Sequence, residues 1–238
     1  MENFVIHKSE SRGLADIGWL KSRHSFSFSS YYNPERMNFG VLRVLNDDAV
    51  DGGKGFGNHP HDNMEIVSIP LEGELVHKDS MGNEATISPG EIQVMSAGTG
   101  IYHAEYNKDG SKPVKFLQIW IYPNKRNVTP RYDQVKIDTG EDNVFQQILS
   151  PNPDDAGVWI YQNAWFNKGK FKAGAEITYN LNDNKNGVYA FILSGSATIN
   201  GHTLENRDGL GIWDVAQLSI KADTDTEILL MEVPMEIE

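Results

Sequence analysis

Short apolar or alternating runs separated by Gly, Pro, Asn and Asp recur along the whole chain, and this pattern constrains the fold most. Runs such as FGVLRVL, EIVSIPL, KFLQIWIYP and GVYAFILSG predict β-strands at the spacing of a sandwich or barrel. The Asn200-Gly201 pair is typical of a type I′ hairpin turn. Helical periodicity is confined to one candidate turn of helix near residues 143–149. The sequence therefore predicts an all-β protein.

A weak internal repeat suggests two copies of one β unit. Residues 70–95 and 192–214 share the order apolar strand, Gly, strand, hairpin turn, strand, Gly-containing corner and apolar strand. Between them, residues 124–157 concentrate Pro, Asn and charge, which is typical of a boundary between domains. The length of 238 residues suits one large domain or two of ordinary size.

Composition excludes several classes of function. The formal net charge of −12 repels nucleic acid phosphates and anionic membrane surfaces, so neither is expected as a partner. The chain has no Cys, so a metal would be held by His, Asp or Glu, and disulfide, thiolate and iron–sulfur chemistry are excluded. With no signal-peptide pattern and no apolar run near the ~20 residues of a membrane span, we expect a soluble cytoplasmic protein.

His59 and His61 form the first candidate ligand pair. Residues two apart in a strand share a face, so both rings can point to one site while Pro60 faces away. Pro60 donates no hydrogen bond to a neighbouring strand, which favours an accessible sheet edge. Two surface histidines in a Gly-rich loop would explain this pair equally well.

A second pair, His103 and Glu105, has the same spacing and also follows glycines. Alone it would be an exposed strand with a salt bridge. If the two strands face each other inside a small barrel, His59, His61, His103 and Glu105 converge as three nitrogens and one oxygen. This set suits one divalent ion of Fe, Mn, Co, Ni, Cu or Zn and leaves coordination positions for other ligands.

The remaining histidines and one acidic residue are weaker candidates. Glu65 follows His61 by four residues, so strict alternation would keep it on the ligand face, as a fifth ligand or, preferably, an acceptor for an imidazole N–H. Four histidines stand alone and are expected to have surface or structural roles: His7, His24, His77 and His202.

Five segments together resemble the pirin family of the cupin superfamily, most closely its bacterial, quercetin-cleaving branch. They are GKGFGNHPHDNME, LEGELVHKDSMGN, SAGTGIYHAEYN, HSFSFSSYYNPERM and FGVLRVLNDD, within residues 12–133. The resemblance implies a bicupin, two small β-barrels of jelly-roll type packed face to face. Residues 1–133 would then form the metal-binding barrel, with the family's ligands matching His59, His61, His103 and Glu105, and residues 134–238 the second barrel.

The internal repeat indicates that the second barrel lacks a metal site. Aligning Gly73 with Gly195 places Leu181 and Asp183 opposite His59 and His61, and residues 220–222 opposite the second pair. Neither Leu181 with Asp183 nor the 220–222 segment forms a chelating pair, so we expect the second barrel to support the first by packing.

The resemblance also implies a function. Quercetin-cleaving relatives bind the deprotonated hydroxyl of a flavonol to the metal, expected to be Fe(II), and dioxygen then attacks the ring, releasing carbon monoxide and a depside. Glu105 would take the substrate proton if an apolar pocket raises its pKa. Phe56, Tyr102 and Tyr106 are candidates for stacking a flat substrate, although alternation puts both tyrosines on the face opposite His103.

Two alternatives remain open at this level. Some pirins resemble non-enzymatic, iron-binding, redox-sensitive regulators that act through a protein partner. The open coordination positions would also suit a metal enzyme that acts on a different enol or diketone.

Overall fold

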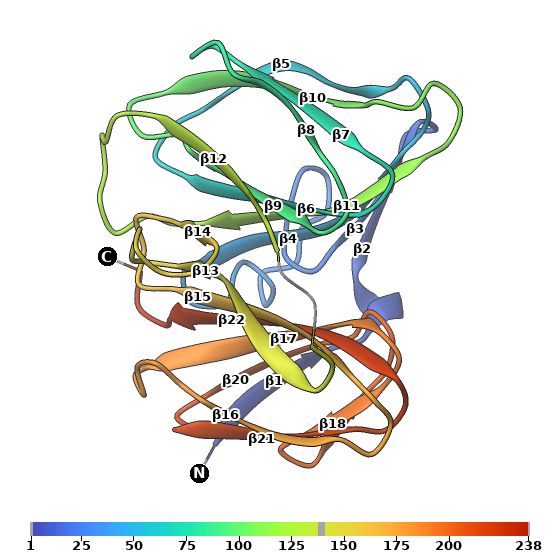
Figure 1. The fold of residues 1–238 in the computed structure, drawn as a ribbon, viewed down its shortest axis with the longest axis vertical. Helices are drawn as coiled ribbons and strands as arrows, with labels where there is room; N and C mark the ends of the chain where they lie inside the picture. Colours follow the sequence, from blue (N-terminus) through green and yellow to red (C-terminus); the bar gives the residue numbers. More distant parts are fainter. Residues whose placement is uncertain (1, 138–140, 238) are drawn as a thin grey trace.

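Four β-sheets arranged as two jelly rolls make up nearly all of the protein (Figure 1). The computed structural model describes residues 2–137 and 141–237. In this part of the chain the only helix is a single 3-10 turn, η1 (Ser9–Ser11), and no helix is long and apolar enough to cross a membrane. The all-β prediction is confirmed.

The first jelly roll, upper in Figure 1, consists of a seven-stranded and a four-stranded sheet that share no strand. In order, its larger sheet contains β12 (Arg131–Lys136), β9 (Glu91–Ser96), β6 (Glu65–Glu72), β11 (Val114–Ile121), β4 (Leu42–Val50), β3 (Leu20–His24) and β2 (Gly13–Asp16). Its smaller sheet contains β5 (Gly55–His61), β10 (Ile101–Asn107), β7 (Leu75–Asp79) and β8 (Glu84–Ile87).

The second jelly roll repeats this arrangement in the lower half of Figure 1. Its larger sheet contains β1 (Asn3–His7), β20 (Gly209–Trp213), β17 (Asn186–Ser194), β22 (Thr226–Pro234), β15 (Trp165–Phe171), β13 (Val144–Ser150) and β14 (Val158–Trp159). Its smaller sheet contains β16 (Glu176–Asn180), β21 (Gln217–Ala222), β18 (Ala197–Ile199) and β19 (His202–Leu204). The predicted bicupin is therefore present, with each half a two-sheet jelly roll rather than a barrel closed by hydrogen bonds.

Local turn chemistry explains one hairpin, whereas one helical prediction is wrong. Asn200 and Gly201 both have positive φ, 46° and 82°, as a type I′ turn requires between β18 and β19.

Residues 143–149 were expected to include a helical turn, but β13 occupies nearly all of this segment and pairs with β15. Apolar residues four apart satisfy the period of a strand as well as that of a helix, and the pairing with β15 decides between them.

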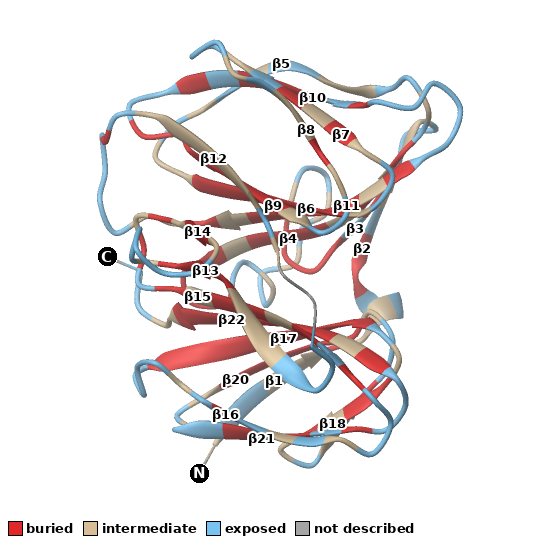
Figure 2. Ribbon diagram, viewed as in Figure 1, coloured by how far each residue is buried: buried red, intermediate tan, exposed pale blue. Residues whose placement is uncertain are grey.

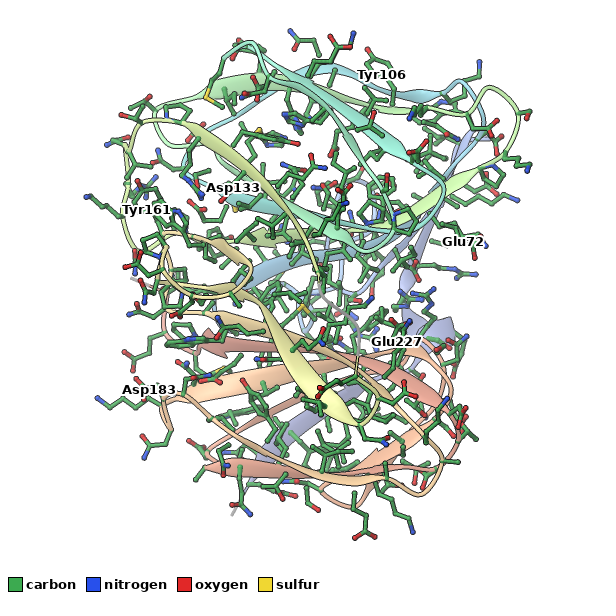
Figure 3. The ribbon with its side chains drawn as sticks, in the orientation of Figure 1. Glu72, Tyr106, Asp133, Tyr161, Asp183 and Glu227 are labelled. Atoms are coloured by element: carbon green, nitrogen blue, oxygen red, sulfur yellow. The ribbon has the colours of Figure 1, made fainter. Side chains whose placement is uncertain are left out.

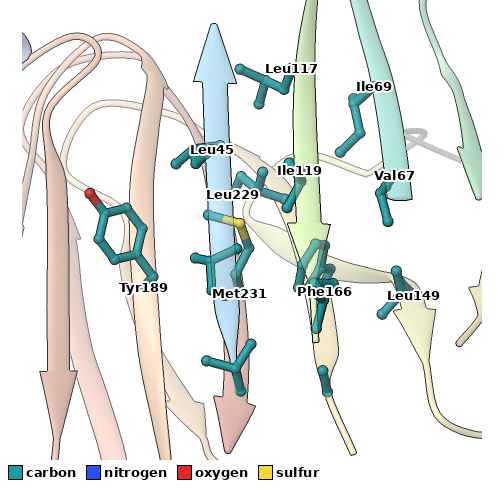
Figure 4. Close-up of a cluster of buried hydrophobic side chains, with 14 of the residues drawn as sticks. Leu45, Val67, Ile69, Leu117, Ile119, Leu149, Phe166, Tyr189, Leu229 and Met231 are labelled. Carbon is teal, nitrogen blue, oxygen red and sulfur yellow. The ribbon is translucent and has the colours of Figure 1, made fainter. Parts of the chain in front are cut away.

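The two jelly rolls pack through their seven-stranded sheets, face to face as predicted. Figure 4 shows the shared core, to which the first roll contributes Leu45, Val67 and Leu117, and the second contributes Phe166 and Leu229. All five side chains are at most 1% exposed. The burial of this apolar surface from both halves, visible as the red layer in Figure 2, is the main stabilising contact between the rolls.

The chain does not divide between the rolls at a single residue. β1, at the N-terminus, pairs with β20 in the second roll, whereas β12 continues the larger sheet of the first roll to Lys136. The division at residue 133 stays a prediction.

The interiors of the two rolls differ in a way that locates the site. Between its two sheets the second roll holds one continuous apolar cluster. The first roll holds two small clusters instead, one around Phe116 and one around Met95. On β11, Leu117 and Ile119 face the shared core, whereas Gln118 and Trp120 face the interior and line a pocket.

Candidate metal centre

Three histidines converge on one point inside the first jelly roll. In the antiparallel pair β5–β10, His103 lies opposite His59, and His61 follows two residues along the same face. The ring centroids lie 4.3 Å apart for His59 and His103, and 4.9 Å apart for each of the other two pairs. One nitrogen from each ring lies within 4.8 Å of the other two, so the predicted convergence of the three imidazoles is present.

The protonation of these rings suits metal binding. Burial and the neighbouring imidazoles lower the pKa of His61 to about 4 and that of His103 to about 2, so both are neutral at pH 7. The Nδ1–H of His59 donates to the Gly57 carbonyl at 2.8 Å, so Nε2 is the ring nitrogen that would bind a metal. His103 Nε2 is buried and has no hydrogen-bond partner within the described residues. These donors fit a divalent transition ion.

Glu105 lies behind His103 rather than among the three rings. It is 4% exposed and accepts a hydrogen bond from Ser68 Oγ at 3.1 Å. Burial, with a contribution from the Asp48 carboxyl, raises the pKa of Glu105 to about 7. A register shift between His103 and Glu105 in the β5–β10 pair separates Glu105 from His59 and His61. Its coordination of an ion held by the three histidines stays a prediction.

His77 belongs to the site, although sequence reasoning assigned it a surface or structural role. It lies opposite Glu105 in the β7–β10 pair and is fully buried. Its Nδ1 lies 3.5 Å from His103 Nδ1, and its Nε2 lies 3.0 Å from Asp79 Oδ2. His77, His103 and Glu105 form a second possible ligand group that shares His103 with the first. The spacing of His77 and Asp79, two residues apart, is the sequence signal that could have identified it.

Glu65 is not on the ligand face, so that expectation was wrong. The chain turns between β5 and β6, where Asn63 has a φ of +43°, and strand alternation does not continue through the turn. On β6, Glu65 shares a face with Val67 and Ile69, which pack in the shared core between the rolls. Its carboxylate accepts a hydrogen bond from Ser96 Oγ at 2.7 Å.

The other three histidines lie outside both ligand groups. His7 is buried and its Nδ1 lies 2.9 Å from the hydroxyl of Tyr189, and His24 is buried against the ring of Phe28. His202 packs on Phe4 near the N-terminus. Their contacts are structural, as expected.

The pocket beside the three histidines has a volume of about 80 Å³ and aromatic walls. Its lining is Phe28, Asn46, Asp48, Phe56, His59, His61, His103, Glu105, Gln118 and Trp120. Phe56 lines this pocket, and its contact with a substrate stays a prediction. Tyr102 and Tyr106 are 53% and 39% exposed on the outer face, where Figure 3 labels Tyr106, so they do not line the pocket.

Comparisons with known proteins agree with this geometry. The family model for pirin matches residues 6–121, and that for the quercetinase C-terminal cupin domain matches residues 147–233. A quercetin 2,3-dioxygenase of Escherichia coli is 41% identical over 229 residues, covering 96% of this chain and 98% of that protein. The chain belongs to the pirin family.

Further relatives are consistent with this membership. A pirin-like protein of Caulobacter vibrioides is 40% identical over 222 residues, covering 92% of this chain and 95% of that protein. The crystal structure of the bacterial pirin YhhW from Escherichia coli in complex with nickel(II) superposes with a TM-score of 0.93 at 39% identity, covering 99% of this chain and all of that one. A pirin of this fold therefore binds a divalent first-row ion.

The second roll of this pirin carries other side chains at the equivalent places. Gly73 and Gly195 both have positive φ and precede β7 and β18, so His77 corresponds to Ile199. Since Glu105 pairs with His77 and Ile220 pairs with Ile199, Ile220 takes the place of Glu105. The sequence comparison had placed residues 220–222 opposite His103 and Glu105. The strand pairing shifts this correspondence by two residues.

By the same pairing, Leu218 takes the place of His103, and Tyr179, which lies opposite Leu218, takes that of His59. Leu181, expected opposite His59, instead corresponds to His61. That the second roll binds no metal stays a prediction.

Proposed function

We propose that this pirin is a metal-dependent dioxygenase that opens the ring of a flavonol such as quercetin. The observation that carries the proposal is a pocket in which three converging imidazoles and a buried carboxyl face aromatic walls. The quercetin 2,3-dioxygenase of Escherichia coli and the quercetinase C-terminal cupin domain, both similar to this chain, support the same reaction class.

The three histidines, with Glu105 as a fourth candidate ligand, would hold one divalent ion per chain. Fe(II) is our first candidate, and Zn, Mn, Co, Ni and Cu are also compatible because such a donor set accepts several first-row ions. When bound, the ion would act as a Lewis acid that lowers the pKa of a substrate hydroxyl and holds it beside dioxygen.

Glu105 is the proposed general base. A carboxyl with a pKa of about 7 can accept the proton of a flavonol hydroxyl near neutral pH and return it to the product. It lies two residues from His103 on β10 and lines the pocket. In the overall reaction both atoms of dioxygen enter the depside, and one ring carbon leaves as carbon monoxide.

The aromatic walls would orient the flat substrate. Trp120 packs edge-on against His61 at 4.9 Å and against Phe28 at 5.3 Å, so its indole is fixed beside the metal ligands. A ring system that slides between Phe28, Phe56 and Trp120 gains stacking contacts and excludes water from the reacting atoms.

Polar atoms on the pocket floor favour a substrate with more than one hydroxyl. Asn46 Oδ1 and Asp48 Oδ1 are buried, line the pocket, and have no partner within the described residues. Hydroxyl groups of a polyphenol would satisfy these acceptors, whereas an unsubstituted ring would leave them unpaired.

The test is turnover of quercetin under air by protein loaded separately with Fe, Mn, Co, Ni and Cu. We expect loss of the flavonol absorbance together with formation of carbon monoxide with at least one metal. Glu105→Gln should lower kcat about 100-fold or more, in the range for loss of a general base, while Tyr106→Phe, on the outer face, should behave as wild type. No turnover with any metal would refute the proposal and favour the regulatory hypothesis.

A further inference from the structure

A buried chain of polar side chains leads from the ligand His103 to the turn between β7 and β8. His103 Nδ1 lies 3.5 Å from His77 Nδ1, and the other nitrogen of His77 lies 3.0 Å from Asp79 Oδ2. The side chains of His77 and Asp79 are fully buried, and His103 is 2% exposed. The two strands fix this order, because His103 lies opposite Asp79 and Glu105 lies opposite His77.

The acceptor at the end of the chain is a carboxylate. Asp79 accepts hydrogen bonds from the backbone N–H groups of Met81 and Asn83 and from the Asn83 side-chain amide, at 2.9, 3.1 and 2.9 Å. Burial alone would raise the pKa of Asp79, but the hydrogen bonds from Asn83 and His77 outweigh it and lower the pKa. Asp79 therefore has no proton to donate to His77.

This fixes the position of every proton in the chain. Because Asp79 only accepts, His77 Nε2 must carry the hydrogen that it donates. A hydrogen on His103 Nε2 would be a buried donor without an acceptor, so His103 carries its hydrogen on Nδ1, which faces the bare Nδ1 of His77. The remaining nitrogen, His103 Nε2, is left with a free lone pair, and it is the buried atom without a partner in the described structure.

We propose that His77 and Asp79 are positioning residues that hold His103 in the Nδ1–H tautomer, so that its Nε2 is ready to bind the metal together with His59 and His61. This inference rests on the metal site of the proposed function, and it adds two residues that do not touch the ion. It also gives a role to a buried His–Asp pair that the proposed reaction does not use.

The surroundings of His77 support a positioning role. The ring of Tyr132, from β12 of the opposite sheet, stacks on His77 with centroids 4.7 Å apart and planes 29° apart. Its hydroxyl donates to Gln134 at 2.7 Å and so lies outside the proton chain. The contact of 3.5 Å between the two imidazoles is long for a hydrogen bond, so its main effect is to select a tautomer. A cation on Nε2 makes Nδ1–H a stronger donor and tightens the contact.

The experiment measures the affinity for Ni²⁺ by competition with a chelating dye, in the full chain. His77→Phe keeps a ring against Tyr132 but removes both nitrogens, and the apparent Kd should rise roughly 10- to 100-fold. His77→Gln should recover most of the affinity, because one amide supplies both an acceptor for His103 and a donor for Asp79. Tyr132→Phe is the matched control and should bind as wild type.

The second readout is the tautomer of His103, observed through its ¹⁵N signals in the metal-free protein. Wild type should show hydrogen on Nδ1, and His77→Phe should shift the population toward hydrogen on Nε2. Hydrogen on Nε2 in wild type would overturn the proposal, whether or not the variants fold. So would a Kd for His77→Phe within about twofold of wild type.

Three further outcomes separate this inference from the proposed reaction and from a role of His77 as a ligand. Two Ni²⁺ ions per wild-type chain, with one lost in His77→Phe, would overturn the proposal by making His77 a ligand within the group His77, His103 and Glu105. Wild type that binds no Ni²⁺ would refute the metal site and this inference together. Tight Ni²⁺ binding with the expected tautomer but without turnover of quercetin would support the inference and refute only the reaction.

Discussion

Replacing Glu65 by Gln should change how the stability of the protein depends on pH. Glu65 is 1% exposed between the two larger sheets, and burial raises its pKa from 4.5 to about 7 despite opposing effects of Ser96 and Arg131. The folded state therefore holds a proton that the unfolded chain releases at lower pH. Between pH 4.5 and 7 the ionisation of Glu65 favours the unfolded state increasingly, and above pH 7 the effect is constant.

The magnitude follows from the two pKa values. A rise from 4.5 to about 7 corresponds to about 3 kcal/mol lost from the free energy of unfolding at pH 8, relative to pH 4. Glutamine stays neutral and can still accept the hydrogen bond from Ser96 Oγ, so Glu65→Gln should match wild type at pH 4 and exceed it by about 3 kcal/mol at pH 8.

The assay is denaturant unfolding at a series of pH values, with the difference between variant and wild type as the result. The matched control is Glu72→Gln, on the same strand, where the side chain is 63% exposed and labelled in Figure 3; this surface substitution should change the free energy of unfolding by at most about 0.5 kcal/mol. A constant difference for Glu65→Gln across this range would refute the protonated, buried state of Glu65.

Three further changes test other parts of the account. In Gly55→Ala the new Cβ would clash with the Glu105 carbonyl oxygen, so β5 and β10 must separate, and metal affinity measured by chelator competition should fall; unchanged affinity would contradict the close strand approach. Leu229→Ala removes a side chain from the core between the rolls and should lower the free energy of unfolding by about 2–5 kcal/mol, measured by denaturant titration; a loss below 1 kcal/mol would contradict tight packing there. Asp48→Leu should weaken binding of quercetin, followed by fluorescence quenching, more than binding of 3-hydroxyflavone, and equal effects would exclude Asp48 as a hydroxyl acceptor.

Much of the site could be predicted because its ligands follow a rule of local geometry. His59 and His61, and likewise His103 and Glu105, are two residues apart, and the two-residue period of a strand puts each pair on one face. The same rule correctly put Tyr102 on the face opposite His103, outside the pocket. The rule failed for Glu65 because a turn at Asn63 separates Glu65 from His61. Side chains alternate between faces only within one continuous strand.

The spacing of His77 and Asp79 could have marked His77 as a candidate, but its position beside His103 could not be predicted, because that position depends on a contact across strands. It is separated from His103 by 26 residues, and only the register between β7 and β10 brings the rings together. The expected correspondence between the rolls erred for a related reason. An alignment through loops of different length misplaced Leu181 by two residues, and the pairing of Tyr179 with Leu218 corrects it.

The most direct test of the central claim is the metal content of the purified protein. After loading with Fe(II) and removal of free ion, wild type should hold close to one metal per chain by elemental analysis. The double variant His59→Ala, His103→Ala removes two of the three converging imidazoles and should hold none, with its jelly-roll fold intact by circular dichroism. Full retention of metal in the folded double variant would contradict the site.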